Sequence, residues 1–161
     1  MDESALAALQ EDAKKQNVSV NTLLNQLVLT YADFDRPMKR FQMIKLPAST
    51  LRYILQGTND ETIIAAGTAV GNDVPRTFIL AKWGEITVAN CLQYLRIMSN
   101  HSKMYEFSEI VRDGNVSVTL SHNLGARGNL FLQNYIKAIF AHVGKSPKFS
   151  SNENAVVFKV Q

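Results

Sequence analysis

The first 35 residues have the apolar spacing of two short helices. In the first helix Leu6, Leu9 and Ala13 recur at i, i+3 and i+7, so they share one face, and Asp2 can cap its start. After an interruption at Asn17, a denser apolar stripe follows, which consists of Leu23, Leu24, Leu27, Val28 and Tyr31. Two helices this short cannot bury both stripes alone, so we expect them to pack on the rest of the chain or on another chain.

The second helix has a marked beginning and end. Ser19 can cap it, because its hydroxyl can accept the backbone N–H of Asn21 or Thr22. We expect the helix to end before Pro37, since the residue that precedes a proline avoids the helical region. Residues 36–40 are then the expected linker between the hairpin, 1–35, and a body, 41–161.

The body changes from a helical to an alternating period near residue 105. Its expected elements are a strand at 41–46, helices at 47–56, 60–70, 75–82 and 87–99, strands at 105–111 and 116–122 around an Asp113-Gly114 turn, a helix at 125–143, and strands at 147–150 and 155–160. The predicted fold class is therefore α+β, a helical hairpin followed by a domain with a mainly antiparallel sheet in the order β-α-α-α-α-β-β-α-β-β.

Local signals divide the helices of the body. Thr58 and Glu61 form a capping-box pattern that starts the helix at 60–70, and Gly71 is expected to end it. Pro75 is expected to open the next helix, because proline is tolerated in a first turn.

Charge is distributed unevenly along the 161 residues, whose net charge is +3. Residues 1–35 contain two lysines and six acidic residues, a net charge of −4, and residues 36–161 carry +7. A basic body can attract an anionic partner such as nucleic acid. The alternative is an ordinary solvated surface, since the chain has no long Lys/Arg run.

Composition narrows the class of protein. Apolar residues make up 46% of the chain and charged residues 19%, which is typical of a globular protein. No apolar run approaches the ~20 residues of a membrane span, and the acidic N-terminus is unlike a signal peptide. Cys91 is the single cysteine and cannot form an internal disulfide. We therefore expect a reduced, cytoplasmic protein with no membrane partner, no metal and no cofactor.

The N-terminal stretch LAALQEDAKKQNVSVNTLLNQL, from Leu6 to Leu27, ends its first helix in an Ala-Lys-Lys run. A short turn, a capping serine and an Asn-x-Leu-Leu-like run follow. In these features residues 3–35 resemble the two helices of the ribbon-helix-helix family of transcription regulators. The remainder of the chain resembles no family that we recognise.

The resemblance implies a homodimer that binds duplex DNA. The family dimerises through these helices, and a two-stranded ribbon, one strand per subunit, enters the major groove. By this resemblance Ser19, Val20 and Asn21 would hold a DNA phosphate at the start of the second helix. Leu23 and Leu27 would lie in the dimer core, and Tyr31 would extend that interface.

One feature departs from the family. The base-reading strand should precede the first helix, where this sequence has Met1. Either the natural chain begins earlier, or the module has kept only its dimerising helices. The net charge of −4 favours the second interpretation, because most DNA affinity comes from phosphate neutralisation.

A candidate ligand site in the body joins the end of a strand to the start of a helix. Gly125 and Gly128 allow close approach of the backbone, and Arg127 can bind an anion beside the free N–H groups of the helix start. His122 can hydrogen-bond such a small anionic ligand or titrate near neutral pH. The alternative is that the glycines only shape a turn, which His122 caps.

The remaining residues of interest have plainer interpretations. Trp83 is more often a core anchor than a stacking platform, and Cys91 fits a small buried residue better than a nucleophile. No catalytic motif is present, so we expect a protein that is not an enzyme; a weaker alternative is a catalytic pocket at His122 and Arg127. The leading hypothesis is a DNA-associated transcriptional regulator that dimerises through its N-terminal helices and senses a ligand or partner with its body. The main alternative is an interaction or sensor protein that uses the hairpin only for assembly.

Overall fold

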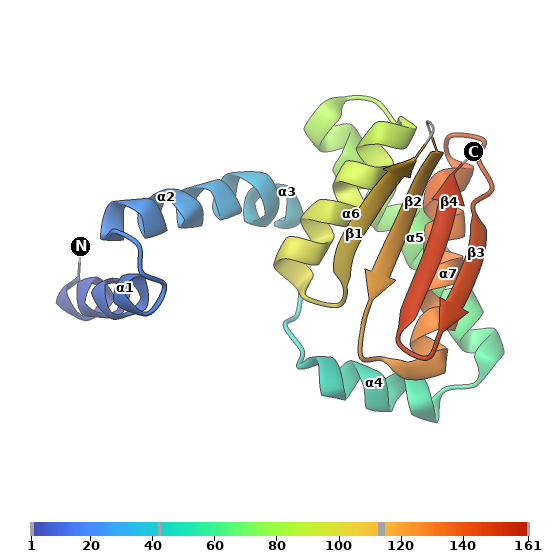
Figure 1. Cartoon of the computed structure of the whole chain (residues 1–161), viewed down its shortest axis with the longest axis horizontal. Coiled ribbons are helices and arrows are strands. Elements are labelled where there is room, and N and C mark those ends of the chain that lie inside the picture. The colour runs from blue at the N-terminus through green and yellow to red at the C-terminus, as the bar shows by residue number, and fades with distance from the viewer. Residues whose placement is uncertain (1, 42, 113–114, 161) are drawn as a thin grey trace. The chain divides into compact units, whose positions relative to one another are not determined.

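The computed structural model describes residues 2–41, 43–112 and 115–160. The chain divides into two compact units, Met1–Arg40 and Phe41–Gln161, which are considered one at a time. The α+β class expected from the sequence is confirmed: the first unit is helical, and the second combines helices with an antiparallel sheet (Figure 1).

The first unit begins with the expected helical hairpin of α1 (Glu3–Lys15) and α2 (Val20–Thr30). Asp2 caps α1 by accepting the N–H groups of Ser4 at 2.9 Å and Ala5 at 3.3 Å. Ser19 caps α2, since its Oγ accepts the N–H of Thr22 at 3.0 Å. Both caps satisfy backbone donors that a helix start leaves without partners.

The expected helix end before Pro37 is wrong. The chain passes from α2 into the π-helix η1 (Tyr31–Asp35) and then into α3 (Arg36–Met38). At this point the N–H of Arg36 donates to the carbonyl of Tyr31, five residues back. The wider π-turn leaves room for the proline ring, which would clash with a carbonyl in a regular α-turn. Because proline has no N–H, no backbone donor is left without a partner at Pro37. Residues 36–38 of the expected linker are therefore helical.

The second unit contains four helices and four strands among its described residues. They are α4 (Ala48–Gly57), α5 (Asp60–Trp83), α6 (Val88–Ser102), β1 (Glu106–Arg112), β2 (Asn115–Ser121), α7 (Gly125–Ala141), β3 (Lys148–Asn152) and β4 (Ala155–Val160). The sheet has the order β1-β2-β4-β3, and every neighbouring pair is antiparallel. In Figure 1 the helices α5, α6 and α7 lie behind one face of this sheet.

The core lies between the sheet and these helices. Alternation along the strands places Val118 and Leu120 of β2 opposite Phe158 and Val156 of β4, and all four are fully buried. The helices contribute further fully buried side chains, among them Phe78, Leu95, Leu132, Ile136 and Phe140. The four strands expected from residue 105 onward are confirmed to within two residues at each end, whereas the Asp113-Gly114 turn lies outside the described residues.

The strand expected at 41–46 is absent from the described part of that segment. Residues 43–46 have no regular structure and pair with no strand of the sheet. Met43, Ile44 and Leu46 are instead 52%, 75% and 50% exposed. A strand forms only where a neighbouring strand accepts it, so apolar content alone was a poor guide here.

The two helices expected at 60–70 and 75–82 form the single helix α5, which contains both Gly71 and Pro75. Its N-cap is Asn59 rather than Thr58, since Asn59 Oδ1 accepts the N–H of Thr62 at 2.8 Å. A Cβ at Gly67 would lie 2.6 Å from the Phe131 carbonyl of α7, and one at Gly71 would lie 2.5 Å from that of Tyr135. The glycines therefore serve close packing of α5 on α7, and this tertiary contact outweighs their local tendency to end a helix.

Candidate functional site

The turn after β2 contains His122, which is buried with only 6% of its surface exposed. The N–H of Leu124 donates to His122 Nδ1 at 3.1 Å, so the ring proton resides on Nε2, which lies 2.9 Å from Asn129 Oδ1 and donates to it. Asn129 Nδ2 in turn donates to the Asn152 carbonyl at 2.6 Å. A chain of hydrogen bonds thus joins the start of α7 to the end of β3.

The electrostatics of His122 favour a neutral ring. Burial lowers the pKa of His122 from its ordinary value of 6.5, and the hydrogen bond to Asn129 opposes that shift only in part. A protonated Nδ1 could not accept the N–H of Leu124. The imidazole therefore holds the turn in its uncharged form and supplies no cation to an anionic ligand.

Gly128 and Gly125 have different local roles. A Cβ at Gly128 would collide with the Leu124 side chain and would lie 3.2 Å from Cε1 of the His122 ring. Gly125 has a φ of +73°, which a glycine adopts without strain. Gly128 therefore allows the ring to pack against the helix, and Gly125 allows the chain to turn into it.

Arg127 is directed at the junction between α4 and α5. Its Nη1 donates to the carbonyls of Leu55 at 3.3 Å and Gln56 at 2.5 Å, and also to that of Thr58. Its Nε lies 3.5 Å from a carboxylate oxygen of Asp60. A cation here adds donors for carbonyls at the end of α4, of which that of Leu55 also accepts the N–H of Thr58 at 3.2 Å, and it complements the negative end of the helix dipole.

These contacts change the interpretation of the ligand site expected at His122, Gly125, Arg127 and Gly128. His122 and Gly128 touch, but the Arg127 guanidinium binds a different part of the body. An anion would have to displace the α4 carbonyls and Asp60 from Arg127, and it would meet a neutral ring at His122. The described contacts are those of the alternative, a capped turn, and ligand binding at these four residues stays a prediction.

Sequence reasoning missed the partners of this turn. Asn129 and Asn152 complete the His122 chain, and the carbonyls of α4 bind Arg127. An asparagine on the first turns of a helix is a weak signal in the sequence. A backbone carbonyl has no sequence signal at all, so the Arg127 contacts could be found only in the structure.

The expected phosphate-binding residues lie at the start of α2. Ser19 and Asn21 are exposed and Val20 is half-buried, while the Ser19 hydroxyl lies 2.8 Å from that of Thr22. The acidic residues Glu11 and Asp12 lie 2.7 Å and 3.9 Å from Lys15 at the end of α1. Phosphate binding at Ser19, Val20 and Asn21 stays a prediction.

The expected dimer interface is divided by the structure. Leu23 is buried, together with Ala13 of α1, so it stabilises the hairpin itself. Leu27 and Tyr31 are 49% and 46% exposed, and Val28 beside them is 62% exposed. The outer part of the stripe is therefore uncovered within the first unit, and a dimer interface at Leu23, Leu27 and Tyr31 stays a prediction.

Other chemically interesting groups of the body are buried, apart from Trp83, which is half-buried. Burial raises the pKa of the Cys91 thiol to about 11, which keeps it protonated and unreactive at neutral pH. The hydroxyls of Tyr94 and Tyr135 lie 2.7 Å apart in the core, and Trp83 packs edge-on against Phe78 with ring centroids 6.1 Å apart. Among the described residues no group of His, Cys, Asp or Glu is placed to hold a metal ion.

No protein-family model matches the sequence, and no curated protein is significantly similar to it. In the part of the chain that the structure describes, every helix is too short or too polar to cross a membrane.

Proposed function

We propose that the protein is a homodimeric, DNA-associated regulator in which the first unit joins two copies and the body senses a ligand or partner. The observation that carries the dimer is the uncovered apolar stripe of α2, with Leu27, Val28 and Tyr31 each about half exposed or more. A unit of 40 residues without a disulfide or metal rarely folds unless it associates. Pairing two stripes would bury these side chains.

The DNA part of the proposal rests on the resemblance to the ribbon-helix-helix hairpin. The capped start of α2, where Ser19 accepts the N–H of Thr22, is the feature of the first unit that supports this resemblance. The amide groups of Val20 and Asn21 stand at the positive end of the helix dipole, where a phosphate oxygen is favoured.

A second candidate function is an assembly protein that does not bind DNA. The observation in its favour is the net charge of −4 on residues 1–35, which repels phosphate. In this case the same stripe would still form a dimer, and the body would be its functional part.

The dimer is tested by Leu27→Asp in the full chain. A buried leucine contributes ~1.5–3 kcal/mol, and a charge in its place has no partner, so the variant should elute as a monomer in size-exclusion chromatography with light scattering. Leu29→Asp is the matched control, since Leu29 is 52% exposed and lies about 200° around the helix from Leu27. An unchanged dimer mass in Leu27→Asp, or equal loss in both variants, would contradict the proposed interface.

A further inference from the structure

The positive charge of the chain is concentrated in residues 36–59, here called the basic segment. It contains no acidic residue and five basic ones: Arg36, Lys39, Arg40, Lys45 and Arg52. Residues 1–35 carry −4 and residues 60–161 carry +2. The charge of +5 in the basic segment therefore exceeds the net charge of the whole chain.

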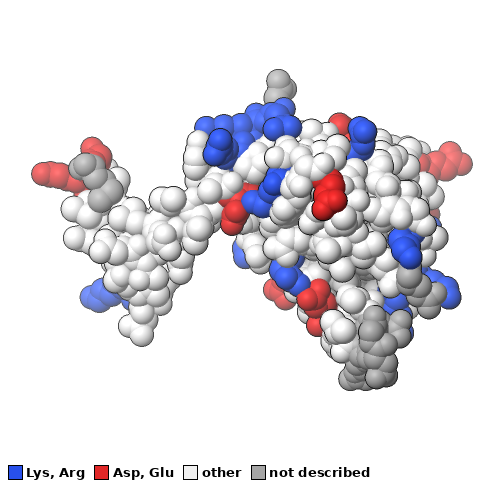
Figure 2. All heavy atoms as spheres, turned by 90° about the horizontal axis from the view of Figure 1, so that it is seen from above, with Lys and Arg blue, Asp and Glu red and all other residues white. Residues whose placement is uncertain are grey.

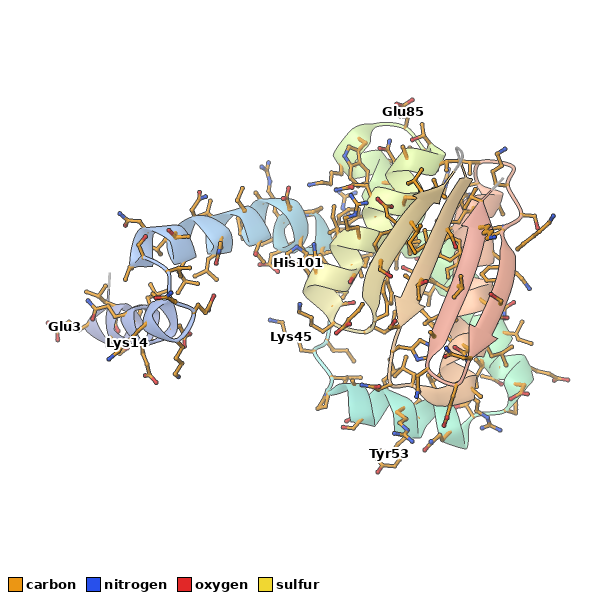
Figure 3. The ribbon with its side chains drawn as sticks, viewed as in Figure 1. Glu3, Lys14, Lys45, Tyr53, Glu85 and His101 are labelled. Carbon is orange, nitrogen blue, oxygen red and sulfur yellow. The ribbon has the colours of Figure 1, made fainter. Side chains whose placement is uncertain are left out.

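The five cations of the basic segment are all exposed. Lys39 donates to the Tyr31 hydroxyl at 3.1 Å, a neutral partner that leaves its charge intact. Lys45 and Tyr53 point away from the body in Figure 3. Elsewhere on the body basic groups meet acidic ones, as in the 2.5 Å pair of Arg96 with Glu109, and Figure 2 shows the two signs of charge interspersed over much of its surface.

We propose that the basic segment is the polyanion contact of this protein and that its partner is the phosphate backbone of duplex nucleic acid. This inference rests on the proposed association with DNA. Because the hairpin is acidic, the cations that neutralise phosphate must come from outside it. Each such contact acts mainly by releasing a counterion, which needs local positive charge and no fixed arrangement of the cations relative to one another.

The basic segment can supply the cations that the acidic hairpin lacks. A phosphate held at Ser19 would gain no cation from residues 16–35, which contain none. The cations begin at Arg36, directly after the helical stretch that follows α2. The residues that would neutralise phosphate are thus different from those of the proposed dimer interface. Substitutions can therefore remove DNA binding and dimerisation separately.

The test is the salt dependence of binding of the full chain to a short labelled duplex of mixed sequence, measured by fluorescence anisotropy. The variant combines Arg40→Gln, Lys45→Gln and Arg52→Gln. Between about 50 and 200 mM salt, the slope of log Kobs against log salt should become shallower by about 2.7 for each chain that contacts the duplex, since each lost phosphate contact contributes about 0.9. The matched control combines Lys145→Gln, Lys148→Gln and Lys159→Gln, three exposed lysines of the body, and should keep the wild-type slope.

Each outcome decides between the alternatives. Equal slopes for wild type and variant, or equal losses in variant and control, overturn the assignment while leaving DNA association intact. A wild type that binds no duplex overturns both the DNA association and this inference, and light scattering then reports whether the dimer survives. Wild-type binding to polyglutamate but not to the duplex identifies an acidic protein as the partner and refutes the nucleic-acid assignment. Circular dichroism melting checks that the variants are folded.

Discussion

His122 joins three parts of the body through one neutral ring. Its backbone N–H donates to the Asn154 carbonyl at 2.8 Å, its Nδ1 accepts from Leu124 and its Nε2 donates to Asn129. The ring must stay neutral for both side-chain bonds to persist. His122, a ligand candidate in the sequence, therefore has structural contacts whose contribution to stability depends on pH.

Acidification should destabilise the body through His122. Its pKa is lower in the folded than in the unfolded chain, so between these values the unfolded chain binds more protons, and stability rises with pH. The contribution of His122 is complete above about pH 6.5, the ordinary value, and is lost as the pH falls below it. Urea denaturation of the wild type at a series of pH values between neutral and mildly acidic should report this loss.

His122→Gln separates this effect from other titrations. At neutral pH the variant should be less stable by about 1–3 kcal/mol, because buried partners lose a hydrogen bond. Its stability should then depend less on pH than that of the wild type. A variant with the same pH dependence as the wild type would show that another group causes the acid sensitivity.

At the scale of elements, the close packing of α5 on α7 is the clearest feature. Gly67, Gly71 and Pro75 follow one another at intervals of four residues and are all buried on one face of α5. The absence of side chains at the two glycines lets the helices approach closely. Glycine and proline often end helices, but here they lie within one helix of 24 residues, because α7 packs closely against them.

Gly71→Ala should disturb this packing. Its Cβ would lie 2.5 Å from the Tyr135 carbonyl and 2.8 Å from Ala138 Cβ, so the helices must separate, at a cost of about 1–3 kcal/mol in the free energy of unfolding. Urea denaturation measures the change. Gly57→Ala is the control, since a Cβ there meets nothing within 4 Å and alanine favours a helix. Equal stabilities of the two variants would contradict the packing role of Gly71.

The whole molecule consists of two units that differ in how they bury apolar surface. The body has a core of fully buried side chains from both helices and sheet. The first unit buries only Ala13, Leu23 and Met38 among its described apolar residues. The body therefore has the core of an independent domain, whereas the first unit has a much smaller core, which is consistent with the proposed dimer.

Limited proteolysis should separate the units. Lys45 lies in the exposed irregular segment 43–46, and proteases cut such segments in preference to packed helices. Trypsin should cleave first after Lys45, and mass spectrometry should find a fragment that begins at Leu46. That fragment should keep a cooperative thermal transition by circular dichroism. First cuts within α5, α6 or α7 would contradict the independence of the body.

The sequence by itself determined the class of the fold and the position of most of its elements. The capping residues Asp2 and Ser19 predicted the starts of their helices, and alternation predicted the strands on either side of α7. Both signals are readable in the sequence because caps and hydrophobic periods act through residues close together in the chain. The same local signals located the turn at His122 and the uncovered stripe around Leu27.

Only the tertiary structure decided what these segments contact. Gly71 and Pro75 lie within one helix because α7 packs against them, residues 43–46 form no strand because no strand pairs with them, and Pro37 is accommodated by a π-turn. The Arg127 guanidinium binds carbonyls at the end of α4, about 70 positions away in the chain. Local preferences are worth about 1 kcal/mol or less per residue, so packing between distant segments overrides them wherever the two disagree.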